Sequence, residues 1–289
     1  MKNNLTAFKN LLEYCYKNNI KIFEACQEQE AKEAEVSVEK IREKTLNILN
    51  VMEQSIQNGI SSSELSASKM TGADCKKLKD FYNKSKTTLN DFQQKVMLYA
   101  LATAEENARM GKIAACPTAG ACGIVPAIIF AYNATKEEQI NALITAGEIG
   151  KIISNKVALA GAIMGCQGEC GSAAAMASGA LVYLNGGNNE QIINAAALTL
   201  KNILGLVCDP IAGLVEVPCV KRNTFMAMTA ITGAELSLAG IQSVVPPDEV
   251  VDAMYQVGTF MSPQLKESSE AGLATTKTGL KITEELQNK

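Results

Sequence analysis

The sequence predicts an all-α protein, folded as one compact multi-helix domain whose glycine-rich loops carry the functional groups. Apolar residues recur at three- and four-residue steps, the spacing of one helix face. Alternation with a period of two residues is nearly absent, and the β-branched clusters are too short for a sheet. A chain of 289 residues can bury a full core. We expect residues 1–60 to form a charged helical layer and residues 61–289 to form the core that holds the functional site.

The N-terminal part shows the clearest helical periodicity. One helix is expected over residues 31–58, followed by Gly59, because glycine often follows the last helical turn. Its apolar positions are Val38, Ile41, Leu46, Ile48, Leu49, Met52 and Ile56. Residues 61–72 are polar and rich in serine and are expected to form a loop. Asp74 then favours the start of a helix over residues 75–83.

The rest of the chain alternates helices with glycine-rich breaks. Further helices are expected over residues 88–110, 124–134, 137–153, 172–184, 189–204, 222–241 and 249–260. Charged residues are concentrated in residues 1–95, whereas glycines are concentrated in residues 111–247. The middle helices are therefore expected to pack tightly on most of their faces. Asp248, which follows two prolines, is expected to cap the helix that begins there.

The composition excludes several classes of site and partner. The chain has no histidine, so it cannot by itself form Ser-His-Asp or Cys-His catalytic groups, HExxH zinc sites or two-histidine iron sites. A formal net charge of −3 and a pI of about 5.3 give no electrostatic case for binding nucleic acid. Residues 113–135 are uncharged, but prolines and glycines break their first half, so we expect no membrane-spanning helix.

The nine cysteines indicate a reducing compartment. Their number is odd, the N-terminal residues lack the apolar stretch of a secretory signal, and the chain is too long to need disulfide bonds. We therefore expect free thiols and a cytoplasmic protein. Cys15, Cys26 and Cys75 lie in or at the start of helical sequence and are expected to be structural.

Three glycine-rich loops hold the other cysteines. They span residues 116–123 (CPTAGACG), 165–172 (GCQGECGS) and 208–223 (CDPIAGLVEVPCVKRN). The first loop precedes a helix and either binds an anion, with Thr118 as a hydroxyl donor, or is a tight turn that serves packing. In the third loop, Asp-Pro and Val-Pro predict non-helical backbone that is exposed at both ends.

Cysteines in such loops are suited to binding a metal. The paired CxxC motifs of zinc sites and the CxxCxxC run of ferredoxins are both absent. The remaining pattern of dispersed thiolates suits an iron–sulfur cluster with one iron left open, which would act as a Lewis acid.

These loops and the segments around them resemble the alpha subunit of the iron–sulfur-dependent L-serine dehydratases. The resemblance covers most of the chain after the N-terminal layer, and the 208–223 stretch is long and specific. It also includes Thr71-Gly72, Asp74, Asn107, PTAGACGIVPA, GCQGECGSA, LAGIQSVVPPDEVVDAMYQVG and GLATTKTG. The resemblance implies a [4Fe–4S] cluster with one open iron, held by Cys166, Cys208 and Cys219, and no pyridoxal phosphate.

The same resemblance implies an L-serine ammonia-lyase that converts L-serine into pyruvate and ammonia. The substrate-binding residues are then expected to be Thr71, Gly72, Asn107, Thr118, Ala119 and Gly120. Glu169 and Lys221 are the candidate catalytic residues. Glu169 binds the ammonium group, moves a proton, or hydrogen-bonds to neighbouring backbone N–H groups. Lys221, together with Arg222, either offsets the charge of the cluster or is part of a solvated pair.

Several positions differ from the family pattern. Residues 156–161 read KVALAG where NASISG is usual, and Ala73 stands where a second glycine is common. Two other activities therefore stay open, namely β-elimination from L-threonine or L-cysteine, and a non-catalytic role as an iron–sulfur partner subunit. Cys116, Cys122 and Cys170 either fill space or offer a reserve thiolate.

The resemblance also implies a partner. Some relatives carry a further domain ahead of the catalytic part, and others carry it as a separate beta subunit. This chain begins directly in helical sequence, so we expect the two-subunit type, as a heterodimer or a dimer of heterodimers. An exposed iron also implies sensitivity to oxygen.

Overall fold

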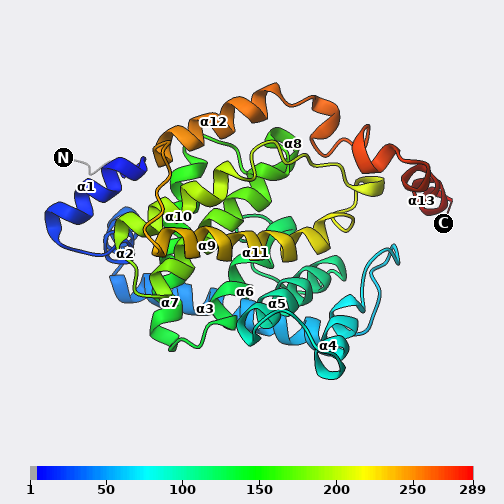
Figure 1. The fold of residues 1–289 in the computed structure, drawn as a ribbon, viewed down its shortest axis with the longest axis horizontal. Coiled ribbons are helices and arrows are strands. Elements are labelled where there is room, and N and C mark those ends of the chain that lie inside the picture. Colours follow the sequence, from blue (N-terminus) through cyan, green and yellow to red (C-terminus); the bar gives the residue numbers. More distant parts are fainter. Residues whose placement is uncertain (1–4, 289) are drawn as a thin grey trace.

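Figure 1 shows a computed structural model of the chain, in which the described residues 5–288 form thirteen α-helices and no β-strand. Residues 1–4 and 289, which belong to the expected layer and core, lie outside the described residues. The helices are α1 (Phe8–Asn18), α2 (Ile22–Glu33), α3 (Val38–Ser61), α4 (Asp74–Lys84), α5 (Asp91–Ala108), α6 (Ile124–Ala131), α7 (Lys136–Ser154), α8 (Gly161–Met164), α9 (Ser172–Leu184), α10 (Asn189–Lys201), α11 (Cys219–Leu238), α12 (Pro247–Phe260) and α13 (Lys277–Gln287). Shorter turns are η1 (Ala119–Ala121), η2 (Gln167–Gly171), η3 (Ile211–Gly213), η4 (Pro263–Leu265) and η5 (Gly272–Thr275). The prediction of a single all-α domain is confirmed.

Helix α9 lies at the centre of the bundle. Helices α6, α7, α10 and α11 pack around it, and residues 172–182 are all buried. Small side chains allow this close approach, and at Gly179 a Cβ would stand only 2.2 Å from Cδ1 of Ile149. Protein interiors leave no room for such an overlap, so a larger residue there would force the Ile149 side chain to move. The prediction that the small-residue helices pack tightly on most faces is confirmed.

The N-terminal helices differ from the prediction of one helix over residues 31–58. Helix α2 ends before a turn at Glu35, whose φ is 54°, and α3 begins at Val38. A cap causes the new start, because Oγ of Ser37 accepts a hydrogen bond from the N–H of Lys40 at 3.3 Å. The predicted start at residue 31 is therefore wrong. The helical stretch up to residue 58 is confirmed, but Gly59 does not end the helix, which continues to Ser61.

Asp248 links the two ends of the chain. It lies in the first turn of α12, and its carboxylate accepts hydrogen bonds from the N–H groups of Phe8 and Lys9 at 2.9 and 3.0 Å. These donors belong to the first turn of α1, so Asp248 caps α1. The expectation that Asp248 caps its own helix is therefore wrong. Helices α1 and α13 were not given residue ranges by the sequence periodicity.

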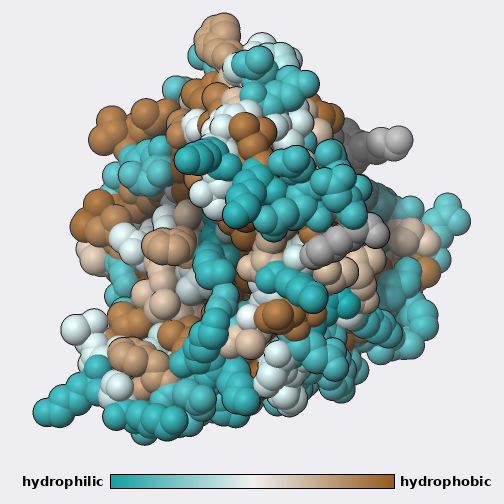
Figure 2. Space-filling model, turned by 90° about the vertical axis from the view of Figure 1, so that its right-hand side faces the viewer, coloured by the Kyte–Doolittle hydropathy of each residue, from teal (hydrophilic) through white to brown (hydrophobic). Residues whose placement is uncertain are grey.

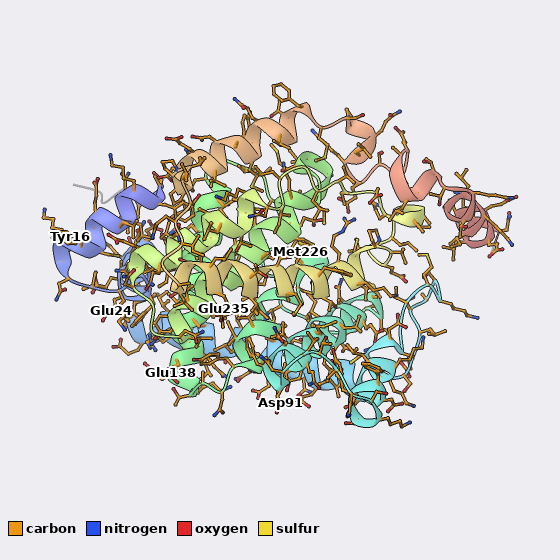
Figure 3. All side chains as sticks on the ribbon, in the orientation of Figure 1. Tyr16, Glu24, Asp91, Glu138, Met226 and Glu235 are labelled. Carbon is orange, nitrogen blue, oxygen red and sulfur yellow. The ribbon has the colours of Figure 1, made fainter. Side chains whose placement is uncertain are left out.

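Charged side chains cover the outside of the bundle. Glu138 of α7 and Asp91 of α5 lie at its rim in Figure 3, and both are exposed. Figure 2 shows the end of the molecule that carries α4 and α13, where hydrophilic and apolar residues are mixed. Among residues 5–288, none of the helices has the length and apolar character needed to cross a membrane.

Candidate active site

Three segments that are far apart in the sequence bring four cysteines together in the interior. Cys166 precedes η2, which holds Cys170, while Cys208 follows α10 and Cys219 begins α11. All four are buried, with at most 6% of their surface exposed. The Cys166 thiol is in hydrogen-bonding contact with the thiols of Cys170 and Cys208, and Cys219 lies near enough to affect their charge. The structure thus brings the three expected ligands together and adds Cys170.

These thiols differ in how readily they lose a proton. Hydrogen bonds from Cys170 and then from Cys208 lower the pKa of Cys166 well below its usual range, and the Arg222 guanidinium lowers it further. Burial raises the pKa of Cys219 to about 12. Cys166 therefore carries the negative charge of the group most readily, and the thiolate is the form that binds iron.

These donors are the candidates for holding a metal group. Within residues 5–288, no three His, Cys, Asp or Glu side chains are placed to hold one metal ion. In an iron–sulfur cluster each cysteine binds a different iron, so the sulfur atoms need not converge on one point. Gly161 packs closely against the thiols, because a Cβ there would lie 3.0 Å from Sγ of Cys208.

The third cysteine loop is not exposed at its two ends, so that expectation is wrong. Cys208 is 2% exposed and Cys219 is 6% exposed. The chain that follows α12 covers the start of this loop. The N–H of Cys208 donates to the carbonyl of Leu265 at 2.9 Å, and the Asp209 carboxylate accepts from the N–H of Leu273 at 2.9 Å. This cover comes from much later in the chain, where local sequence could not reveal it.

Two neighbouring basic residues in the first turn of α11 have different partners. The Arg222 guanidinium donates to the carbonyl of Val207 at 2.9 Å and is in hydrogen-bonding contact with Cys166. Lys221 instead forms an ion pair with Asp74 of α4 at 2.7 Å, and its side chain is 57% exposed. Arg222 therefore offsets the charge of the thiolates, whereas Lys221 joins α11 to α4.

Glu169 lies in η2, and its carboxyl group is close to the cysteines. Its Oε2 is 2.7 Å from where a Cβ of Gly161 would stand, and its Oε1 is 3.6 Å from where a Cβ of Gly120 would stand. Burial, followed by the charge of Cys166, raises the pKa of Glu169 to about 7, and the nearby Thr118 hydroxyl partly offsets this rise. Within the described part of the chain, no backbone N–H stabilises this carboxylate.

Asn223 of α11 fixes the turn that holds Thr118, Ala119 and Gly120. Its Nδ2 donates to the Gly120 carbonyl at 2.7 Å, and its Oδ1 accepts from the N–H of Gly123 at 2.9 Å. The Thr118 hydroxyl is buried in this turn and makes no hydrogen bond of normal geometry to residues 5–288. A buried hydroxyl of this kind is available to a ligand. The sequence did not single out Asn223, because its partners are about a hundred positions away.

The serine-rich loop places Thr71 and Gly72 beside the third cysteine loop. The Thr71 hydroxyl donates to Oε2 of Glu216 at 3.0 Å, and Ser66 and Ser68 donate to the same atom at 2.6 and 2.7 Å. Gly72 has a φ of 116°, and a Cβ there would lie 2.4 Å from a backbone oxygen. Only glycine fits this position.

The remaining positions singled out in the sequence are Asn107, Lys156 and Ala73. Asn107 is half-buried in the last turn of α5, which packs against α11 and η1. Lys156, where the family pattern is broken, forms an ion pair with Asp252 at 2.7 Å. Ala73 has a φ of 60°, a conformation that favours glycine and explains why a second glycine is common there.

The other five cysteines are also free thiols. Burial raises the pKa of Cys75, Cys116 and Cys122 to about 12 and that of Cys15 to about 11. Burial likewise raises the pKa of Cys26 well above its usual range. Neutral buried thiols of this kind behave as small apolar side chains.

Comparison with known proteins identifies the family. The family model described as serine dehydratase alpha chain matches residues 17–274. An L-serine dehydratase alpha chain of Peptoniphilus asaccharolyticus is 43% identical, over 96% of this chain and 97% of its own length. A Bacillus subtilis protein named "Probable L-serine dehydratase, alpha chain" is also 43% identical, over 96% of this chain and 94% of its own. An L-serine dehydratase of Streptomyces coelicolor is 42% identical, over 62% of this chain and 41% of its own. The chain therefore belongs to the serine dehydratase alpha chain family.

Proposed function

We propose that this chain is an L-serine ammonia-lyase, which converts L-serine into pyruvate and ammonia. The substrate loses its β-hydroxyl group and its α-proton as water, and the resulting aminoacrylate tautomerises to an imine that water hydrolyses. The observation that carries this proposal is the meeting of Cys166, Cys208 and Cys219 beside the Glu169 carboxyl. The extended similarity to proteins named L-serine dehydratase alpha chain supports the same activity.

We propose that Cys166, Cys208 and Cys219 hold a [4Fe–4S] cluster. Two points support this: the thiols are buried together, and Arg222 supplies a positive charge beside them. When bound, such a cluster would supply a Lewis acid at the iron that has no protein ligand, and this would weaken the bond between the substrate carbon and its β-hydroxyl group. The aminoacrylate route needs no pyridoxal phosphate.

The substrate is expected to lie between the first cysteine loop and the serine-rich loop. The Thr118 hydroxyl, which lies beside Glu169, is suited to donate to the substrate carboxylate, with Ala119 and Gly120 forming the wall of the turn. Thr71 and Gly72 approach from the other segment, and Asn107 is the further polar group that the family resemblance assigns.

We propose Glu169 as the group that takes the α-proton. Its carboxyl lies between the Gly120 turn and Gly161, so it faces both the proposed substrate position and the cysteines. With no histidine in the chain, the base must be a lysine, a carboxylate or a thiolate, or a group lent by the beta chain. Lys221 is paired with Asp74, so we propose a tethering role for it in place of the catalytic role that the sequence indicated.

We also propose that the chain works with a separate beta chain in the cytoplasm. The relatives of similar length are named alpha chains, and the Streptomyces coelicolor relative extends well beyond the matched part. Nine free thiols are consistent with a reducing compartment. Gel filtration of a co-expressed pair tests the association, and two separate peaks would contradict it.

Pyruvate formation tests the activity. The chain is reconstituted anaerobically with iron and sulfide, combined with the beta chain, and supplied with L-serine, L-threonine or L-cysteine, with 2-oxobutyrate measured in place of pyruvate for L-threonine. We expect pyruvate from L-serine, and kcat lowered at least about 100-fold in Glu169→Gln, because a positioned proton-transfer group contributes roughly that much. Glu190→Gln, on the exposed side of α10, is the matched control. A loaded complex that forms no pyruvate from L-serine would contradict the proposal.

A further inference from the structure

Glu216 gathers three hydroxyl groups of the serine-rich loop onto one carboxylate oxygen. Ser66, Ser68 and Thr71 donate to its Oε2 at 2.6, 2.7 and 3.0 Å. Glu216 is 8% exposed, and Ser66 and Thr71 are 3% and 2% exposed. Hydrogen bonds to a charged acceptor are stronger than those between neutral groups, so this contact dominates the interface between the two loops.

The Glu216 carboxylate takes its side-chain hydrogen bonds from these hydroxyls. Within residues 5–288, no lysine or arginine forms an ion pair with it. A buried carboxylate without a cation needs hydrogen-bond donors, because its burial is otherwise unfavourable. Three donors from one loop meet that need, and they hold the loop in a single position relative to Glu216.

The backbone of Glu216 is fixed to the start of α11. Its carbonyl accepts a hydrogen bond from the N–H of Val220 at 2.9 Å, and Cys219 is the first residue of that helix. The position of the Glu216 side chain is therefore set by the same turn that sets the position of Cys219. Lys221, on the other side of Cys219, pairs with Asp74 directly after the serine-rich loop. Two contacts that flank Cys219 thus hold residues 66–74.

The serine-rich loop needs such external contacts. Its backbone passes through left-handed conformations at Lys69, Gly72 and Ala73, with φ of 65°, 116° and 60°. For the two residues that are not glycine, this conformation is strained, because the Cβ crowds the following carbonyl oxygen. Internal bonds, such as the 2.9 Å bond from the N–H of Ser66 to the carbonyl of Thr71, shape the loop but do not attach it to the cysteine segment.

We propose that Glu216 is a positioning residue for the substrate side of the active site. It seats the loop that carries Thr71 and Gly72 on the turn that leads to Cys219, and so fixes the distance between the substrate-binding loop and the cluster ligands. Lys221 is the weaker contact, because it is exposed and screened by solvent. The proposal rests on the proposed function for its effect on catalysis, while the seating of the loop is independent of it.

Hydrogen exchange and kinetics on the reconstituted complex with the beta chain test this role together. In Glu216→Gln we expect amide exchange in residues 62–73 to be at least about tenfold faster, with exchange in α9 unchanged. We expect KM for L-serine to rise at least about tenfold, while kcat changes less than about threefold and iron per chain stays at the wild-type value. Glu216→Asp keeps the charge and is expected to restore part of the KM.

Glu64→Gln, at an exposed carboxylate in the same loop, is the matched control and should match wild type in every readout. If Glu216→Gln does not fold, Ser66→Ala with Ser68→Ala carries the test, since it removes two of the three donors and leaves the carboxylate in place. Unchanged exchange in residues 62–73 overturns the proposal. A loss of iron, or a fall in kcat at constant KM, also overturns it, because either result means a role other than positioning substrate. If wild type forms no pyruvate, the proposed function fails, and the exchange measurement still decides whether Glu216 seats the loop.

Discussion

Asn223 holds the turn of the first cysteine loop against the start of α11, and its removal has a calculable effect on stability. The side chain donates to the Gly120 carbonyl and accepts from the N–H of Gly123, and it is 1% exposed. Its third contact, to the Cys219 carbonyl, is less critical, because that oxygen also belongs to the helix. Asn223→Ala therefore leaves the buried N–H of Gly123 and the half-buried carbonyl of Gly120 without partners, at about 1–3 kcal/mol each, with the half-buried group at the lower end. We expect a loss of about 3 kcal/mol in the free energy of unfolding.

Urea unfolding followed by circular dichroism measures this loss. The control is Asn202→Ala, in which an exposed side chain loses a single bond to the Leu198 carbonyl. We expect the control to lose less than about 1 kcal/mol, in line with surface substitutions. If the two variants lost the same free energy within about 0.5 kcal/mol, Asn223 would not be the link between these segments.

Three further outcomes are expected. Gly161→Ala places a methyl group 2.7 Å from Oε2 of Glu169 and 3.0 Å from Sγ of Cys208, so bound iron should fall severalfold with the helical content retained. Gly147→Ala, where a Cβ meets nothing within 4 Å, should keep its iron, and equal iron in both variants would contradict this use of space. Arg222→Met should lower the iron content, because the thiolates are then left without a cation. Lys221→Met should keep its iron and lower the free energy of unfolding by no more than about 1 kcal/mol. A larger loss of iron in Lys221→Met than in Arg222→Met would contradict the two assignments. Burial raises the pKa of Glu148 in the folded protein, so the protonated carboxyl favours the fold more than the ionised one does. The contribution of Glu148 to the free energy of unfolding is therefore full below the unfolded pKa and is lost as pH rises through the folded pKa. The stability of Glu148→Gln relative to wild type, measured by urea midpoints, should therefore increase as the pH rises from 5 to 8. A difference between the two midpoints that stays constant with pH would contradict this.

The helices were predictable where the local sequence determines them. Apolar spacing and glycine-rich breaks placed the helices from α5 to α12 close to their observed bounds, except for the short helix α8, which was not predicted. The break before α3 was not predicted, because apolar residues continue on both sides of Ser37 while its hydroxyl caps the new helix. Asp248 was recognised as a capping residue, yet its carboxylate caps α1, a partner far away in the sequence.

The site was predictable in its residue types and less so in its contacts. The dispersed cysteines in glycine-rich loops pointed to the group that Cys166 forms with its neighbours. Burial of Cys208 depends on the chain after α12, which pairs with it over a long sequence distance. Successive residues on a helix project about 100° apart, so Arg222 reaches the thiols while Lys221 reaches α4, a choice that spacing alone does not fix.

Iron and sulfide content after anaerobic reconstitution tests the central claim most directly. Wild type is compared with Cys166→Ala, Cys208→Ala and Cys219→Ala, with Cys15→Ala in α1 as the buried-cysteine control. We predict four irons and four sulfides per chain in wild type and in the control, as a [4Fe–4S] cluster requires. Each of the three site variants should lose most of its iron. A Cys208→Ala chain that keeps the iron content of wild type would contradict the assignment of these thiols as the cluster ligands.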